Sequence, residues 1–125
     1  MSFSELNKEE VKEKIREVSN YVEKRSMGRT KIIAVTKSFD KEVIAIAREA
    51  GIKAVGENYA QELIEKHRAL GDPEIEWHMI GAIQRNKIRK LSGILSLWQS
   101  VDRIEVLEEI KKRDPAGKVL IQINP

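Results

Sequence analysis

The sequence has no cysteine, and it has few histidine and aromatic residues. Histidine occurs twice, and Phe, Trp and Tyr together make up 5% of the 125 residues. Without cysteine the chain can form no disulfide, thiolate metal site or thiol nucleophile, and two histidines offer little to a zinc site. The scarcity of aromatic side chains also argues against single-strand nucleic-acid binding by base stacking.

Long apolar runs are also missing. No stretch approaches the roughly 20 apolar residues of a membrane span, and the first residues lack the apolar core of a secretion signal. The 23 basic and 20 acidic residues leave a net charge of +3. This small surplus is weak evidence for nucleic-acid binding, and we do not expect a nucleic-acid partner. We therefore predict a single cytoplasmic domain over residues 1–125, with no membrane partner and no metal.

Short apolar runs alternate with amphipathic segments along most of the chain. A long N-terminal helix is predicted from a capping box at Asn7 and Glu10 to a stop at Gly28. Strands are predicted at 31–35, 52–56, 75–80, 94–99 and 119–123, helices capped by Asp40, Asn58 and Asp102, and a basic helix over 83–91. This alternation is typical of a parallel sheet with right-handed crossovers.

Two α/β architectures fit this order: an open doubly wound sheet of flavodoxin type, and part of a (β/α)8 barrel. In an open sheet covered on both sides, central strands should be apolar on both faces. Three strands instead pair an apolar face with a partly polar one. The opposed sets are Glu76 and His78 against Trp77 and Met79, Ser96 and Ser100 against Leu95 and Leu97, and Gln122 and Asn124 against Val119, Ile121 and Ile123. This pattern favours a barrel segment, since 125 residues are too few for a whole barrel.

Lys37 is the sharpest single feature of the sequence. It directly follows the apolar run 32–35, at the carboxyl end of a predicted strand, where α/β proteins place their active sites. The two-residue period of a strand puts Lys37 on the face of Ile33 and Val35, which predicts an amine directed into the shielded interior. A shielded amine loses its proton more readily, and a free amine is what Schiff-base formation requires. Taken alone, a rim lysine that reaches into water is the commoner arrangement.

Polar residues also follow the next two predicted strands. Asn58, in Gly56-Glu57-Asn58-Tyr59, suits either a helix cap or a ligand contact, and the cap is the commoner role. His78, in Trp77-His78-Met79-Ile80-Gly81, suits either a hydrogen-bonded structural histidine or a ligand contact. The basic stretch 84–90 could hold a phosphate or an RNA backbone, or simply form a solvated helix face. Glycine-rich nucleotide-binding fingerprints are absent.

Four motifs occur together in this order: Ala34-Val35-Thr36-Lys37; Gly56-Glu57-Asn58-Tyr59 with Gln61-Glu62; Trp77-His78-Met79-Ile80-Gly81 with Gln84 and Asn86-Lys87; and Ser100-Val101-Asp102. From Lys31 onward the chain resembles the pyridoxal phosphate homeostasis protein family, which is similar to the N-terminal barrel of alanine racemase. The resemblance implies a TIM-barrel-like fold of parallel β/α units, with about five of the eight strands present and an extra N-terminal helix. It also implies binding of pyridoxal 5′-phosphate (PLP) in vitamin B6 homeostasis, without established catalytic turnover.

The resemblance also implies roles for particular residues. Lys37 matches the lysine that holds PLP as a Schiff base, and Asn58 and His78 fall at the mouth of the pocket as expected cofactor contacts. The chain would be the N-terminal part of the barrel, without the phosphate site that such barrels build after strands seven and eight. We therefore expect weakened PLP affinity, and self-association through unpaired strand edges. PLP-dependent apoenzymes are the expected protein partners.

Two other functions stay open from the residues alone. One is a PLP-dependent enzyme of racemase type, which needs a second acid or base opposite Lys37. The other, less favoured, is a phosphate- or RNA-binding module that uses Arg85 to Lys90.

Overall fold

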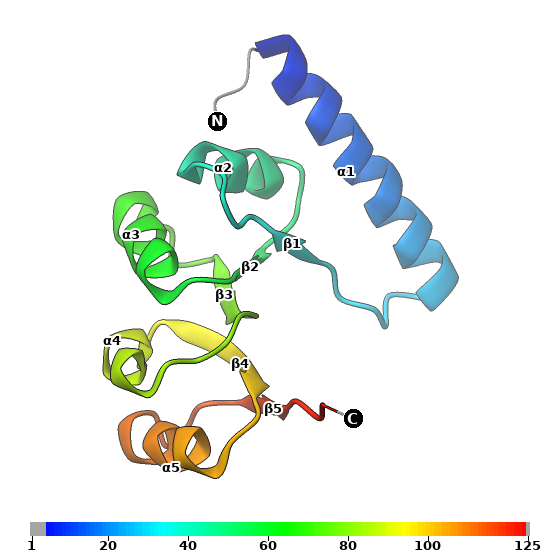
Figure 1. Ribbon diagram of the computed structural model, residues 1–125. Helices are drawn as coiled ribbons and strands as arrows, with labels where there is room; N and C mark the ends of the chain where they lie inside the picture. Colours follow the sequence, from blue (N-terminus) through cyan, green and yellow to red (C-terminus); the bar gives the residue numbers. More distant parts are fainter. Residues whose placement is uncertain (1–4, 125) are drawn as a thin grey trace.

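A computed structural model describes residues 5–124 and contains one five-stranded parallel sheet (Figure 1). Its strands are β1 (Ile33–Val35), β2 (Ala54–Glu57), β3 (Glu76–Met79), β4 (Leu95–Val101) and β5 (Val119–Ile121). The helices are α1 (Glu5–Ser26), α2 (Lys41–Glu49), α3 (Ala60–Leu70), α4 (Ile88–Leu91) and α5 (Ile104–Arg113), with a 3-10 turn, η1 (Arg85–Lys87), before α4.

The order of the strands distinguishes the two architectures. Each strand pairs in parallel with the next one along the chain, giving β1-β2-β3-β4-β5. A doubly wound sheet instead reverses its strand order at a switch point. Helices α2 to α5 lie on one side of the sheet (Figure 1), as the helices of a (β/α)8 barrel do. The preference for a TIM-barrel-like segment is therefore confirmed.

The hydrophobic core lies between the sheet and helices α2 to α5. Trp77 and Trp98 from the sheet meet Ile44, Leu63 and Ile110 from the helices, and each of the five is at most 2% exposed. Burying one such aliphatic or aromatic side chain contributes roughly 1.5–3 kcal/mol. This helix-covered side, called the outer face below, therefore holds the fold together.

The other side of the sheet, called the open face below, carries one row of aligned residues. The strand register places Val35, Gly56, His78 and Leu97 next to one another in this row. Val35 on β1 and Leu120 on β5 are 52% and 51% exposed. The helix layer therefore leaves the two outermost strands open to water on this side.

The predicted faces of β4 need a correction. Leu95 pairs with Trp77 on the outer face, whereas Leu97 pairs with His78 on the open face, because the register shifts between Trp77 and His78. The expectation that both leucines share one face, opposite two serines, is therefore wrong. The faces predicted for Glu76, Trp77, His78 and Met79 on β3 are confirmed, with Trp77 and Met79 in the core.

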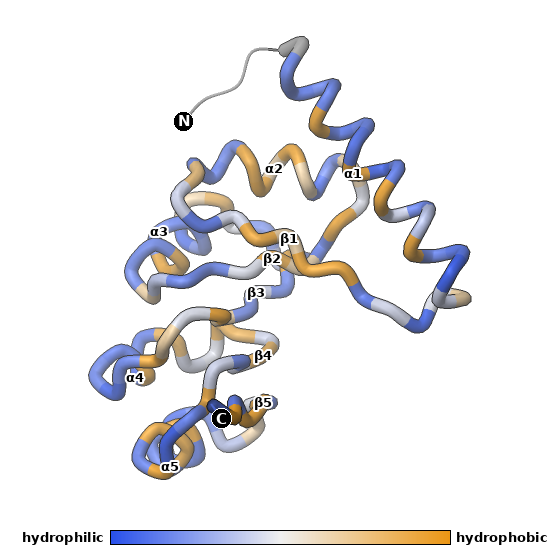
Figure 2. Tube along the Cα trace, turned by 45° about the vertical axis from the view of Figure 1, so that its right-hand side comes forward, coloured by the Kyte–Doolittle hydropathy of each residue, from blue (hydrophilic) through white to orange (hydrophobic). Residues whose placement is uncertain are grey.

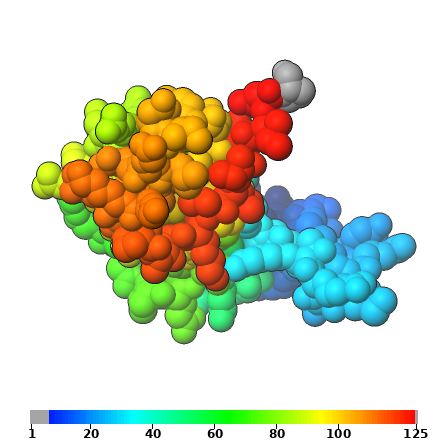
Figure 3. Space-filling view, turned by 90° about the horizontal axis from the view of Figure 1, so that it is seen from below, coloured from blue at the N-terminus to red at the C-terminus, as the bar shows by residue number. Residues whose placement is uncertain are grey.

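Helix α1 stands apart from the layer formed by the other helices (Figure 3). Ion pairs attach it to α2, one of them from Lys8 to Glu42 at 2.7 Å. Hydrophilic residues separate the apolar ones along most of its length (Figure 2). The predicted stop at Gly28 is confirmed, with φ +74° and a hydrogen bond from its N–H to the Glu23 carbonyl. The predicted capping box is wrong, because Asn7 lies inside the helix.

Of the three residues predicted to cap helices, only Asp40 lies at the N-cap position of its helix. Asp40 does precede α2, but its side chain makes no capping hydrogen bond. Tyr59 and Arg103 occupy the N-cap positions of α3 and α5, so Asn58 and Asp102 are not caps. Within residues 5–124, no helix has both the length and the apolarity needed to cross a bilayer.

Candidate functional site

Hydrogen bonds join the residues that directly follow β1 and β3 to the carboxyl ends of β2 and β4, which together form one rim of the sheet. The Thr36 N–H donates to the Gly56 carbonyl at 3.1 Å, and the Ile80 N–H donates to the Glu57 carbonyl at 3.0 Å. The Ser100 hydroxyl then donates to the Ile80 carbonyl at 2.7 Å. Backbone groups and the Ser100 hydroxyl therefore fix the rim from β1 to β4, which suits a binding site.

Gly81 allows the rim to close between β2 and β3. A Cβ atom at this position would lie 2.1 Å from the carbonyl oxygen of Asn58, and its other nearest atoms are also Asn58 backbone. Only glycine permits such an approach. This contact fixes the backbone of Asn58 at the rim, and because Asn58 is not the helix cap, its side-chain amide is not used for capping.

Lys37 lies in a tight turn at the same edge. The Phe39 N–H donates to the Thr36 carbonyl at 3.3 Å, and Ser38 adopts the left-handed conformation with φ +65°. The Lys37 side chain is exposed, so the expectation of a shielded amine is wrong for residues 5–124. The reason is that β1 is an edge strand whose open face lacks a covering layer. Within the described part of the chain, the Lys37 ammonium has no hydrogen bond or ion pair.

Lys66 presents the opposite case, although it lies close to the same turn. Its Nζ atom contacts the Thr36 carbonyl at 2.8 Å, Glu57 Oε1 at 2.6 Å and Glu62 Oε1 at 2.8 Å. These contacts use all three N–H donors of the ammonium, and the residue is 7% exposed. The amine of Lys66 is thus committed to the protein, whereas that of Lys37 is available.

Glu57 is the most deeply buried charge-bearing side chain at this edge, at 0% exposure. Its Oε1 atom accepts hydrogen bonds from Lys66 and, at 2.8 Å, from the Thr36 hydroxyl, whereas Oε2 has no partner. Burial raises the pKa of Glu57, although the hydrogen bonds from Lys66 and Thr36 act in the other direction.

Sequence reasoning missed this cluster of Glu57, Glu62, Lys66 and Thr36. The signals that point to it are an acidic residue at a strand end and a Glu62–Lys66 pair at the i,i+4 spacing of a helix. Neither signal shows that Lys66 turns inward, because the contact with Thr36 joins residues 30 positions apart.

His78 points to the open face from within β3. It is 4% exposed, its Nδ1 atom lies 3.1 Å from Gln99 Nε2, and its Nε2 atom lies 3.9 Å from Glu76 Oε2. Because an amide nitrogen can only donate, Nδ1 accepts and the proton of the neutral ring sits on Nε2, which has no partner. Burial lowers the pKa of His78, with a further contribution from the positive charge of Lys31.

The structure places the three predicted contacts, Lys37, Asn58 and His78, in one region but at different positions along the strand direction. Lys37 and Asn58 each lie two residues beyond the paired Val35 and Gly56, at the rim. His78 is level with Gly56 and therefore lies deeper along the sheet than the other two. A ligand held by all three would extend from the rim onto the open face.

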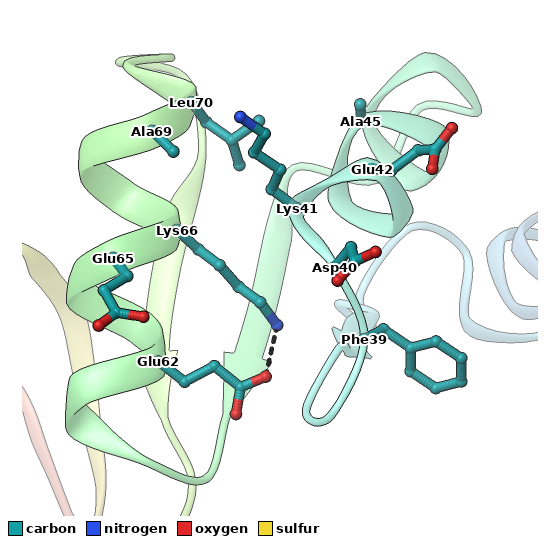
Figure 4. A pocket seen from close by; sticks show the side chains of 10 residues that line it. All are labelled: Phe39, Asp40, Lys41, Glu42, Ala45, Glu62, Glu65, Lys66, Ala69 and Leu70. Carbon is teal, nitrogen blue, oxygen red and sulfur yellow. Dashed lines mark hydrogen bonds and ion pairs between the residues drawn. The ribbon is translucent and has the colours of Figure 1, made fainter. Parts of the chain in front are cut away.

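A separate cleft of about 820 Å³ lies between α2 and α3, in the helix layer (Figure 4). Its lining residues are Phe39, Asp40, Lys41, Glu42, Ala45, Glu62, Glu65, Lys66, Ala69 and Leu70. None of the three predicted contacts is among them. Lys66 and Glu62 line this cleft and also bond to the Lys37 turn, so the cleft lies next to the turn on its helix side.

The predicted basic helix over 83–91 forms only a 3-10 turn and one turn of α-helix. Arg89 and Lys90 are exposed there, and Arg85 lies 3.9 Å from Glu109. Within residues 5–124, no group of His, Asp and Glu side chains is arranged to hold a metal ion.

The chain is similar to curated proteins of one kind, although no family model matches it. The pyridoxal phosphate homeostasis protein of Aquifex aeolicus is 39% identical over 98 residues, which cover 75% of this chain and 43% of the relative. That of Haemophilus influenzae is 37% identical over 108 residues, which cover 82% of this chain and 46% of the relative. The chain is a homologue of the pyridoxal phosphate homeostasis proteins. It spans about half the length of the curated relatives it matches.

Solved structures give the same result. PipY of Synechococcus elongatus PCC7942, with PLP bound, matches with a TM-score of 0.76 and 28% identity over 88% of this chain and 54% of PipY. A structure described as an unknown protein from Bifidobacterium adolescentis matches with a TM-score of 0.77 and 26% identity over 90% of this chain and 52% of that chain. The resemblance carried by the four sequence motifs is therefore confirmed for the family and for its fold.

Proposed function

We propose that this chain binds PLP as part of vitamin B6 homeostasis in the cytoplasm, with Lys37 holding the cofactor as a Schiff base. The observation that carries the proposal is the contrast between two lysines at the carboxyl edge. Lys66 is buried and bonded to three acceptors, whereas Lys37 is exposed and free of partners among the described residues. The relatives named for PLP homeostasis and the PLP-bound neighbour support the choice of ligand.

The chemistry of PLP fits the groups at this edge. PLP supplies an aldehyde, and the Lys37 ammonium, after losing a proton, attacks the carbonyl carbon through its nitrogen; a C=N bond forms and one water leaves. No ion pair of Lys37 must break first. We propose Asn58 and the Nε2–H of His78 as further contacts, because the first lies at the rim and the second is a buried donor with no hydrogen-bond partner among the described residues.

We propose a binding role without catalysis, with PLP-dependent apoenzymes as recipients of the cofactor. We also propose that residues 1–125 act as one domain that corresponds to the N-terminal part of the barrel. Self-association through the outermost strands is part of the proposal, since Ile121 on β5 is 60% exposed and β1 is the other sheet edge. Sedimentation velocity over a range of concentrations tests it: a monomer at every concentration contradicts self-association.

Borohydride trapping tests the role of Lys37. The 125-residue protein is mixed with PLP, reduced, digested and mapped by mass spectrometry, alongside Lys37→Ala and the matched variant Lys41→Ala, which removes a nearby exposed lysine. We expect one dominant adduct on Lys37, lost in Lys37→Ala and retained in Lys41→Ala. Equal labelling of many surface lysines, or an unchanged adduct yield in Lys37→Ala, contradicts the proposal. Exchange of an amino acid α-hydrogen in deuterated water would show catalysis and favour the racemase-type function.

A further inference from the structure

The turn that carries Lys37 is held on both sides of Lys37 by side chains of α3. Lys66, from α3, donates to the Thr36 carbonyl at 2.8 Å, just before Lys37. Glu62, also from α3, accepts from the Ser38 N–H at 2.9 Å, just after Lys37. The backbone on both sides of Lys37 is therefore bonded to α3, whereas the Lys37 side chain itself is free.

A buried charge arrangement keeps these two side chains in place. Lys66 Nζ lies between Glu57 Oε1 at 2.6 Å and Glu62 Oε1 at 2.8 Å, and the Lys66 and Glu57 side chains are 8% and 0% exposed. Removing a buried charge from water is costly unless every partner is present with good geometry. Figure 4 shows the Lys66 side chain extending from α3 toward the segment before α2, with Glu62 beside its ammonium. The arrangement therefore has little freedom to shift.

The conformation of the turn explains why such support is needed. Ser38 adopts φ +65°, a backbone region that residues other than glycine, asparagine and aspartate seldom occupy. A conformation of this kind persists only when the surroundings hold it. The Glu62 carboxylate on the Ser38 N–H is one such hold, and the bond from Lys66 to the Thr36 carbonyl is the second.

We propose that Glu57, Glu62 and Lys66 form an anchor that positions the Lys37 turn and thereby sets how fast Lys37 captures the cofactor aldehyde. The three are positioning residues. Glu62 and Lys66 bond to the backbone of Ser38 and Thr36, Glu57 holds Lys66 and the Thr36 hydroxyl, and none of them contacts the Lys37 amine. The link to aldehyde capture rests on the proposed function, whereas the hold on the turn does not.

The test uses Glu62 because its side chain is 26% exposed, so a variant is expected to fold. Glu62→Ala removes the acceptor for the Ser38 N–H, and Glu62→Gln restores an acceptor oxygen there without the charge. Arg113→Gln is the matched control, because it breaks a similar i,i+4 pair with Glu109 on α5. Lys66→Met removes the centre of the anchor, and Lys66→Arg is its conservative counterpart.

The first measurement is amide hydrogen exchange by NMR without PLP. We expect Glu62→Ala to speed exchange at the Ser38 amide about tenfold or more while amides of α5 stay unchanged, and Glu62→Gln to recover at least part of the protection. Arg113→Gln is expected to leave the Ser38 amide as in the wild type. Unchanged exchange at Ser38 in both Glu62→Ala and a folded Lys66→Met overturns the anchor.

The second measurement is the rate of Lys37 modification by PLP with borohydride, compared with the rate of its reductive methylation by formaldehyde. We expect Glu62→Ala to slow the PLP reaction several-fold and to leave the formaldehyde reaction within twofold, since the amine stays exposed. Equal PLP rates in the wild type and a variant with a loosened turn overturn the link to capture. If wild-type Lys37 takes up no PLP, the proposed function and this link fail, and the exchange data alone decide whether the anchor holds the turn.

Discussion

The two faces of the sheet differ in what they do for the molecule. On the outer face, Trp77 and Trp98 are at most 2% exposed and pack against four helices. On the open face, Val35 and Leu120 keep about half of their surface in water. Apolar burial therefore stabilises the fold from one side, and the other side and its rim remain available for a ligand. Substitutions on the two faces should differ accordingly.

The largest expected effect is on the outer face, at Trp98. Trp98→Ala removes a fully buried side chain whose Nε1–H donates to Asp114 Oδ2 at 3.0 Å. Large-to-small changes of this kind in a core lower the free energy of unfolding by about 3–5 kcal/mol. Urea unfolding followed by circular dichroism measures the loss, with Leu120→Ala on the open face as the matched variant. Similar losses in both variants would mean that the faces are equally buried in solution.

The next largest effect is expected at the rim, where the two faces meet. Gly81→Ala places a Cβ atom 2.1 Å from the Asn58 carbonyl oxygen, so the backbone between β2 and β3 must move apart. Overpacking of this kind costs roughly 1–3 kcal/mol. Thermal unfolding measures it, with Ala82→Ser at the exposed neighbouring position as the control. A Gly81→Ala protein as stable as the control would contradict the close approach at the rim.

Most of the architecture could be predicted because the spacing of apolar residues along the chain shows which side chains are buried. All five strands occur in the predicted order, as in the apolar run that became β1 (Ile33–Val35) and the alternation that became β3 (Glu76–Met79). Helix starts were less predictable. Asn58 and Asp102 have the right chemistry for caps, yet each lies one residue before the N-cap position of its helix. Cap chemistry is local, whereas the start of a helix depends on how it packs.

The candidate site was predicted only in part. The position of Lys37 after the first strand follows from the sequence, and the structure places it at the carboxyl edge of β1. Its exposure does not follow, because it depends on what covers the open face. The anchor was missed for the same kind of reason. Lys66 looks like one charged residue on a solvated helix, and only the fold brings it within 2.8 Å of the Thr36 carbonyl.

His78, on the open face, should make the free energy of unfolding depend on pH. Burial and the charge of Lys31 lower its pKa from 6.5, so the unfolded chain takes up a proton near pH 6.5 while the folded protein does not. The unfolded state then binds more protons, and the free energy of unfolding falls as the pH drops below 6.5, by about 1.4 kcal/mol for each unit of pKa difference. Above pH 6.5 His78 is neutral in both the folded and the unfolded state, and no stability is lost through its protonation.

The variant His78→Gln isolates that contribution. Urea unfolding at several pH values between 7 and 5 should show a shallower loss of stability in the variant than in the wild type. The raised pKa of Glu57 acts in the opposite direction in this range, since the folded protein then takes up the proton first as the pH falls. This second effect is present in both proteins and cancels in the difference. Identical slopes would mean that His78 is not held neutral by its surroundings.

The smallest expected effect is at Val35, on the open face of the edge strand β1. Val35→Thr keeps a β-branched side chain, which suits a strand, and places its hydroxyl where the residue is already 52% exposed. The free energy of unfolding should change by no more than about 0.5 kcal/mol, as is usual for surface positions. Sedimentation velocity should at the same time show weaker self-association, because the substitution removes apolar surface from an uncovered face. A stability loss as large as that of Trp98→Ala would instead mean that Val35 is buried in solution by a second copy of the chain. In that case, the difference in unfolding free energy between wild type and variant should shrink at tenfold lower protein concentration.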